Sequence, residues 1–246
     1  MRIVFNLLLV FVFLSKSLYF SQETVSQNDF IFNNFKIDFI VIKVDDFILK
    51  NLTYKKNESH ETNSDLVQNL LSKDSSFLLL NACITDSICD PLGLFVDNYR
   101  IEKQVNYNNG NGNFYLKPNG LFLVTDSEIR ITESSQIKDF SRVRLGIQSG
   151  PLLLDNGSVN SSFNINSVNK KIRLGVGVFS KKSEDYLVFI KSEDEINFYD
   201  FSMIFQNKFK CKNALCLESQ GCVINFPDNY DLNNTNKYCN YLFLDL

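Results

Sequence analysis

Polar residues and glycines recur at the ends of apolar runs in the second half of this 246-residue chain. The segment Gln148–Pro151 follows the strand-like segment Val143–Ile147, and Arg173 opens a further run that contains Gly175 and Gly177. Glycine allows a backbone to approach a ligand closely, and arginine offers a planar fork of donors that suits phosphate or carboxylate groups. These residue types predict a polar pocket on a β scaffold that holds an anionic or sugar-like ligand.

Several common catalytic chemistries are disfavoured by what the chain lacks. His60 is the only histidine, and it lies in a polar stretch with no residue to orient it. This argues against Ser-His-Asp and Cys-His mechanisms and against a His-rich metal centre. No phosphate-cradling Walker sequence or dinucleotide-binding fingerprint occurs. Carboxylate, amide and guanidinium groups remain, and carboxylates can cleave glycosidic bonds. A phosphate leaving group would also need a cation to neutralise it.

The first seventeen residues have the features of an export signal. Arg2 precedes an apolar run, Ile3–Leu14, and small residues follow at Ser15 and Ser17. The run is shorter than the ~20 residues that span a bilayer, although an uncleaved anchor is the alternative. We therefore expect a secreted or periplasmic protein without stable membrane insertion after cleavage. Cleavage would take the formal net charge from -3 to -5 by removing two basic residues, which argues against nucleic acid as a partner.

Six cysteines follow the predicted signal, and an even number in an exported chain predicts disulfides. Cys83 and Cys89 are close enough in sequence to close a small loop, and the other four could staple the C-terminal region. A zinc site is a disfavoured alternative because no histidine lies nearby and no Cys-x-x-Cys pair occurs. Free buried thiols are a third alternative. We expect neither a metal nor a cofactor.

The spacing of apolar residues predicts a fold with many strands and a few helices. Helical spacing occurs in Asp65–Lys73 and in Asn197–Lys208. Ile37–Val44 alternates like a strand, and the apolar run Phe77–Leu80 predicts a buried strand that ends at Asn81. Two hairpins are also expected, one joining 172–179 to 186–190 and one at the Asn-Gly pair within 117–120. This content predicts an α+β fold in a single domain.

The order and spacing of several short segments carry a family resemblance. The chain resembles the phosphodiester glycosidase family, which includes the uncovering enzyme, and is most similar to its short exported bacterial branch. The resemblance covers roughly residues 37–227. The segments that carry it are Leu80–Ala82, Pro91–Val96, Gly112–Phe122, Gln148–Leu153, Ile172–Val178 and Cys211–Leu217.

The resemblance implies a fold, an activity and a set of site residues. The fold would be a curved mixed β-sheet with flanking helices over residues 37–246, after a lead segment at 18–36. The activity would be hydrolysis of a sugar-1-phosphodiester or a related glycosidic bond, with a carbohydrate or sugar-phosphate substrate. Arg173 would steady the anionic leaving group, and Glu218 would act as base or nucleophile. The substrate-binding residues would be Asn81, Gln148, Ser149 and Gly150.

Two departures from the family pattern open an alternative function. The family continues its Asn-Ala or Asn-Gly pair with glycine and an aromatic residue or methionine, but here the chain continues Cys83-Ile84-Thr85. Where the family has Asp-Gly, this chain has Glu218-Ser219. Serine cannot replace a glycine that needs positive φ, and shifts of about 1 Å can cost ~10²-fold in rate. The alternatives are a weakened or inactive glycan-binding relative and a disulfide-stapled structural or interaction protein.

Each site residue also has an ordinary structural explanation. Arg173 could be a solvated or paired surface cation, and Glu218 a strand-end surface residue. Asn81 could bond its own backbone in a turn. Gln148 and Ser149 could hold a loop through side-chain-to-backbone hydrogen bonds.

Overall fold

The computed structural model describes residues 25–246 except positions 59, 74–75, 82–83, 218–223, 226 and 228–229. The predicted signal peptide at 1–17, the catalytic candidate Glu218 and two of the cysteines, Cys83 and Cys222, lie outside the described residues. The described part is 42% strand and 13% helix, and its strands form three antiparallel sheets.

The predicted α+β class with a mixed sheet is therefore wrong, and the chain has a mostly-β fold. Every described pairing between named strands is antiparallel, including the long hairpins β1–β2 and β12–β13. Parallel pairing requires a crossover of a dozen or more residues, usually a helix. The described α-helices are few and short, so they cannot supply the repeated crossovers of a mixed sheet. They are α1 (Asp46–Asn51), α2 (Asn63–Leu71) and α3 (Phe198–Asn207).

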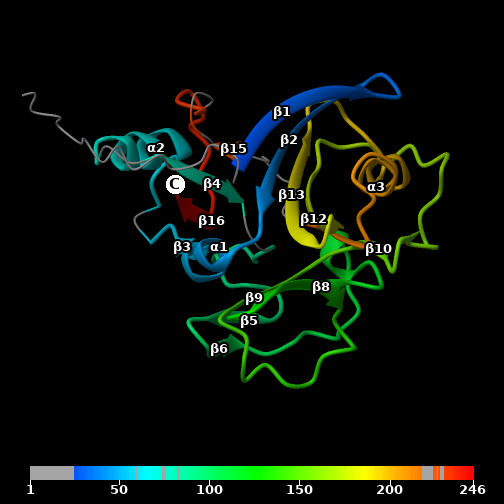
Figure 1. Cartoon of the computed structure of the whole chain (residues 1–246), viewed down its shortest axis with the longest axis horizontal. Coiled ribbons are helices and arrows are strands. Elements are labelled where there is room, and N and C mark those ends of the chain that lie inside the picture. The colour runs from blue at the N-terminus through cyan, green and yellow to red at the C-terminus, as the bar shows by residue number, and fades with distance from the viewer. Residues whose placement is uncertain are drawn as a thin grey trace, which may run out of the picture.

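The largest sheet has seven strands and carries the two long hairpins (Figure 1). Asn33 and Asn34 turn the first hairpin and Lys182 and Ser183 the second, all with positive φ as a two-residue turn requires. The second hairpin confirms the prediction for residues 172–190. In spatial order the strands are β1 (Val25–Phe32), β2 (Phe35–Lys43), β13 (Glu184–Ser192), β12 (Leu174–Lys181), β14 (Asn213–Cys216), β10 (Leu152–Asp155) and β11 (Ser158–Val159).

Helix α3 covers one face of this sheet (Figure 1), as its apolar spacing predicted. Asn197 begins the helix, because its side chain accepts a hydrogen bond from the backbone N of Asp200 at 2.8 Å. The helix packs closely at Gly177, where a Cβ would lie 2.7 Å from a ring carbon of Phe205. Burial raises the pKa of the neighbouring Cys211 thiol to about 12, so this cysteine stays protonated.

A four-stranded sheet lies on the other side of the seven-stranded sheet (Figure 1). Cys239, the residue before the inner strand Asn240–Asp245 of this sheet, is joined by a disulfide to Cys89, which is 150 residues away in sequence. Cys89 therefore does not close the small loop with Cys83 that the sequence allowed. Helix α2 and the buried strand β4 confirm the predictions for residues 65–73 and 77–80. The strands are β15 (Ile224–Asn225), β4 (Phe77–Asn81), β16 (Asn240–Asp245) and β3 (Thr53–Lys56).

A five-stranded sheet closes the remaining side. The hairpin predicted at 117–120 is wrong, because residues Asn113–Tyr115 form a 3₁₀ turn and β7 pairs with β8 and β9 instead. Asn119 is buried and donates to the carbonyl of Phe114 at 3.1 Å, so it is an internal residue and not an exposed turn. The strands are β6 (Arg100–Lys103), β5 (Phe95–Asp97), β9 (Leu145–Ser149), β7 (Gly120–Val124) and β8 (Ile129–Glu133).

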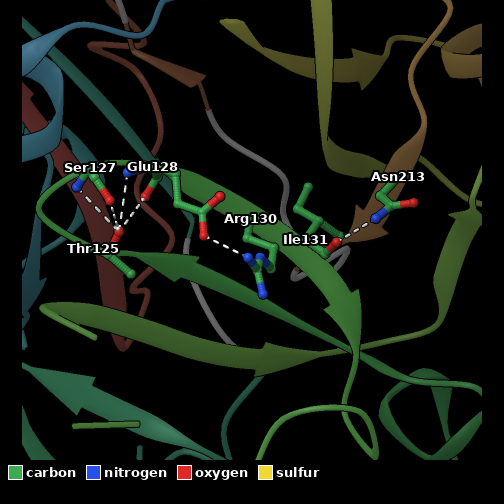
Figure 2. Close-up of polar contacts among 6 residues, drawn as sticks. All are labelled: Thr125, Ser127, Glu128, Arg130, Ile131 and Asn213. Carbon is green, nitrogen blue, oxygen red and sulfur yellow. Dashed lines mark hydrogen bonds and ion pairs between the residues drawn. The ribbon is translucent and has the colours of Figure 1, made fainter. Parts of the chain in front are cut away.

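Polar contacts fix the five-stranded sheet against the seven-stranded one. Figure 2 shows Thr125 organising the β7–β8 turn through its hydroxyl, which accepts hydrogen bonds from the backbone N atoms of Ser127 and Glu128. In the same view Asn213 of β14 donates to the carbonyl oxygen of Ile131 in β8 at 2.6 Å. Asn213 also accepts a hydrogen bond from the backbone N of Asn156. A single amide thus joins β8, β14 and the β10–β11 turn.

The three sheets share one hydrophobic core, which contains buried residues from each of them. A second cluster lies between the seven-stranded sheet and α3. In the part of the chain that the structure describes, no helix has the length and apolar character needed to cross a membrane.

Candidate functional site

The segments that carry the predicted site residues converge on the core shared by the three sheets. Leu80 precedes Asn81, Ile147 precedes Gln148, and Leu174 follows Arg173. The side chains of Leu80, Ile147 and Leu174 are fully buried in this core. Leu217, the residue before position 218, is fully buried there too. The backbone N of Leu217 donates to the carbonyl of Leu174 at 2.9 Å. Segments distant in sequence therefore meet around one apolar centre.

The side chain of Gln148 is 1% exposed and works as a clamp between loops. Its Oε1 accepts hydrogen bonds from the backbone N atoms of Leu94 at 3.0 Å and Asn106 at 2.8 Å. Its Nε2 donates to the carbonyl of Asn106 at 2.8 Å and to Oδ1 of Asn119 at 3.3 Å. Because both amide hydrogens are engaged, Gln148 can fix the loops around the site but has no donor left for a ligand.

Ser149 and Gly150 contribute differently. Ser149 is fully buried, and among the described residues its Oγ has no hydrogen-bond partner. Strand alternation places it on the same face of β9 as the core residue Ile147, opposite to Gln148. A buried hydroxyl that keeps its bonding capacity is uncommon. Gly150 is required by crowding, since a Cβ there would lie 2.8 Å from the carbonyl oxygen of Phe114.

Arg173 is buried, with 1% of its surface exposed, so it is not a surface cation. Its Nε donates to the carbonyl of Ile196 at 2.7 Å and its Nη2 to the carbonyl of Asn169 at 3.0 Å. The guanidinium lies 3.5 Å from the ring centroid of Phe198 at the start of α3. The group therefore lies on the α3 face of the sheet, whereas Leu174, the next residue, faces the shared core.

Asn81 ends β4 opposite Tyr241 and is 2% exposed. Alternation along β4 places it on the face of Phe77 and Leu79, which pack under α2. The structure thus brings the predicted segments to one core but turns their side chains to different faces. Only Ser149 faces that core, while Gln148, Arg173 and Asn81 point to other sides.

A hollow of about 870 Å³ opens where β2 begins and β13 ends. Lys36 and Asp38 of β2 line it together with Lys191 and Glu193. Lys191 and Glu193 also line an adjoining hollow of about 320 Å³ that reaches Ile172, next to Arg173. The hollows therefore adjoin the start of β12. The remaining residues of the larger hollow are Gln27, Asn28, Asp29, Phe39, Ile40, Ile224, Pro227, Tyr230 and Asp231.

A carboxyl pair lies on the wall of this hollow. Asp38 is directly opposite Lys191 in the β2–β13 register, and the Lys191 Nζ donates to Glu193 Oε1 at 2.7 Å. Burial, followed by the hydrogen bond and negative charge of Glu193, raises the pKa of Asp38 to about 6. Burial also opposes ionisation of Glu193, but the hydrogen bond and charge of Lys191 outweigh it and lower the pKa of this carboxyl. The pair therefore holds a proton on Asp38 and a charge on Glu193 in mildly acidic solution.

The sequence did not single out these four charged residues. The alternation in Lys36-Ile37-Asp38 does place both charges on one strand face, which is a usable signal. Their meeting with Lys191 and Glu193 depends on the β2–β13 pairing between distant segments. Among the described residues, no group of three or more His, Cys, Asp and Glu side chains is placed to hold a metal ion.

Comparisons with known proteins agree with this architecture. Residues 72–230 match the sequence profile of the phosphodiester glycosidase family. The chain is 31% identical over 153 residues to the uncharacterized protein YigE of Escherichia coli (strain K12). That alignment covers 62% of this chain and 59% of YigE, so the chain spans less than two thirds of this relative.

Two solved structures share the fold. The catalytic domain of zebrafish N-acetylglucosamine-1-phosphodiester alpha-N-acetylglucosaminidase, auto-inhibited by its pro-peptide, matches with a TM-score of 0.56 and 12% identity. That match covers 89% of this chain and 81% of the zebrafish chain. A hypothetical protein from Synechocystis matches with a TM-score of 0.55 and 11% identity over 90% of this chain and 62% of its own. From the profile match over most of its length, the chain belongs to the phosphodiester glycosidase family.

Proposed function

We propose that this protein hydrolyses sugar-1-phosphodiesters by cleaving the bond between the anomeric carbon and the phosphate oxygen. The observation that carries the proposal is the convergence of Leu80, Ile147, Leu174 and Leu217 on one core beside a charged hollow, in a chain of this family. Carboxylates beside an anomeric carbon can stabilise or attack a cationic transition state. The hollow of about 870 Å³ is large enough for a sugar and its phosphate.

In this proposal some of the predicted residues take part in the reaction, and the others bind the substrate or hold the loops that surround it. Glu218 acts as base or nucleophile, and Arg173 supplies positive charge near the leaving phosphate from behind the start of β12. Ser149 offers its hydroxyl to the sugar, because its Oγ keeps hydrogen-bonding capacity among the described residues. Asn81, Gln148 and Gly150 shape the substrate-binding surface, Gln148 through the loops that it clamps.

We also propose that the protein is exported through its N-terminal signal and works in a secreted or periplasmic location. The disulfide Cys89–Cys239 supports an oxidising compartment. The alternative is a weakened or inactive relative that binds glycans. The departures at Cys83-Ile84-Thr85 and Glu218-Ser219 favour this alternative, because they change the residues next to two of the converging strands.

Sugar release from a panel of sugar-1-phosphodiesters tests the proposal. We expect the wild type to release free sugar and Glu218→Gln to be slower by at least about 10²-fold, as loss of a catalytic carboxylate predicts. Glu184→Gln is the matched control, because Glu184 pairs with Lys43 at the opposite end of β13 from the hollow. It should retain wild-type rates.

Three outcomes would count against these assignments. Equal rates for Glu218→Gln and the wild type would remove Glu218 from the mechanism. Saturable sugar binding without turnover would favour the glycan-binding alternative. If the protein showed no turnover and no ligand-dependent rise in melting temperature, both functions would be contradicted.

A further inference from the structure

The carboxyl pair in the larger hollow is held on a rigid part of the sheet. Strand β2 pairs with β13 from Lys43–Tyr186 to Ile37–Ser192, and with β1 along the whole length of the first hairpin. Asp38 therefore has a cross-strand neighbour on each side, Asp29 from β1 and Lys191 from β13. Side chains directly opposite each other in such a ladder are within contact distance. The geometry of the pair is fixed by backbone hydrogen bonds on both flanks.

Charged groups on β2 and at the end of β13 act on Asp38. On β2 itself Lys36 is the nearest cation, and its backbone N donates to Asp194 Oδ2 at 2.7 Å. Lys191 and Glu193 face Asp38 from β13 and the residues that follow it. Burial is the largest cause that opposes a charge on Asp38, followed by the hydrogen bond and negative charge of Glu193, while the charges of Lys191 and Lys36 act in the opposite direction. Asp29 of β1 and the C-terminal residues Tyr230 and Asp231 complete the wall.

An ion pair at the other end of β2 and β13 provides a comparison, because it neither lines the hollow nor contains a carboxyl group with a raised pKa. Lys43 and Glu184 lie 2.6 Å apart with 39% and 46% of their side chains exposed, and they line no part of the hollow. The hydrogen bond from Lys43 lowers the pKa of Glu184 in the ordinary way. The retained proton is therefore specific to the end of the sheet that adjoins the converging segments.

We propose that Asp38 is the proton donor of the hydrolytic site. Glu193 is a positioning residue that keeps the Asp38 carboxyl group protonated beside the hollow, and Lys191 is a positioning residue that holds Glu193 through its hydrogen bond. The proposal rests on the proposed hydrolysis of sugar-1-phosphodiesters. It assigns the hollow to the leaving phosphate group, with Lys36 as the exposed cation at its rim. Arg173 keeps its proposed role as a positive charge for the leaving phosphate, and Glu218 keeps its proposed role as base or nucleophile.

The proton balance of the reaction explains the need for such a group. Water oxygen bonds to the anomeric carbon, and the bond from that carbon to the phosphate oxygen breaks with its electron pair going to oxygen. Asp38 transfers its proton to the departing phosphate oxygen, and the carboxylate of Glu218 takes a proton from water. The products are the free sugar and a phosphomonoester monoanion. The leaving group has a pKa of ≈ 6, close to the value of about 6 for Asp38, so proton transfer between them is nearly balanced.

The dependence of kcat/KM on pH tests the assignment. A general acid works only when protonated, so the wild-type rate should fall as pH rises through about 6. Asp38→Asn should lose on the order of 10²-fold in kcat/KM below that pH and should no longer show the decline. Glu193→Gln removes the group that holds the proton on Asp38, so the decline should move to lower pH while the low-pH rate is largely retained. Glu184→Gln should leave the profile unchanged.

The controls separate this inference from the proposed function. Melting temperatures within a few degrees of wild type show that each variant is folded. If Asp38→Asn does not fold, Glu193→Gln still tests the assignment. Sugar release by Asp38→Asn at the wild-type rate at every pH, or an unmoved decline in Glu193→Gln, would overturn the role of Asp38 alone. No release of sugar by the wild type would overturn the proposed function and this inference with it.

Discussion

Arg173→Ala is expected to lower the free energy of unfolding by about 3–5 kcal/mol. The guanidinium donates to the carbonyl of the buried residue Ile196 and to the carbonyl of the exposed residue Asn169, and it lies over the ring of Phe198. Truncation would leave these carbonyls without their charged donor and remove the contact that holds 169–173 to the start of α3. The hydrogen bond to the buried Ile196 carbonyl contributes about 1.5–3 kcal/mol. The hydrogen bond to the exposed Asn169 adds about 0.5–1.5 kcal/mol, and the ring contact adds roughly 1 kcal/mol.

Denaturant unfolding of matched variants measures this effect. Arg173→Lys should recover only part of the loss, because a single ammonium cannot make both hydrogen bonds and stack on the ring. Arg130→Ala is the control, since the exposed Arg130–Glu128 pair shown in Figure 2 contributes about 0–1 kcal/mol. A loss below about 1 kcal/mol for Arg173→Ala would contradict the structural role argued from these contacts. Activity of this variant is then meaningful only under conditions in which it is folded.

Gly93→Ala should destabilise the protein by about 3 kcal/mol, the upper range for overpacking in a core. A Cβ at this position would lie 2.1 Å from Gln148 Oε1 and 2.7 Å from a ring carbon of Phe114. The amide of Gln148 would have to move, and it would then release the backbone N atoms of Leu94 and Asn106. The donor of the buried Leu94 and that of the half-buried Asn106 would lose their acceptor, which adds to the steric cost.

A double-mutant cycle identifies the source of this loss. In a Gln148→Ala background, Gly93→Ala should cost less, because the amide oxygen closest to the added Cβ is gone and only the contact with the Phe114 ring remains. Gly157→Ala is the control: Gly157 has φ of 81° and nothing within 4 Å of an added Cβ. It should cost only about 1 kcal/mol, from backbone strain alone. If Gly93→Ala lowered the free energy of unfolding equally with and without the Gln148 side chain, the proposed role of Gln148 in holding the loops would be contradicted.

The sequence predicted the elements whose apolar spacing is regular. The phenylalanine spacing of α3, the apolar run of β4 and the glycine-containing hairpin of β12 and β13 all lie where expected. The fold class was wrong because several strands, such as β6 (Arg100–Lys103), are short and mainly polar. Such strands are stabilised by cross-strand neighbours, which depend on tertiary pairing and leave little local signal.

The site was only partly predictable for a related reason. The segments that glycines and strand-end polar residues singled out have apolar neighbours in the shared core, such as Ile147 and Leu174, while their roles in a site stay predictions. Residue type did not show that the amide of Gln148 and the guanidinium of Arg173 make internal hydrogen bonds. Asp38 was missed because its environment is created by Glu193, which is brought near only by strand pairing.

The position of bond cleavage is the most direct test of the proposed activity. A sugar-1-phosphodiester would be hydrolysed by the wild-type protein in water enriched in a heavy oxygen isotope, and both products would be analysed by mass spectrometry. Attack at the anomeric carbon predicts that the heavy oxygen is found in the sugar and is absent from the phosphomonoester. Heavy oxygen in the phosphate group would mean attack at phosphorus, and it would contradict a glycosidase.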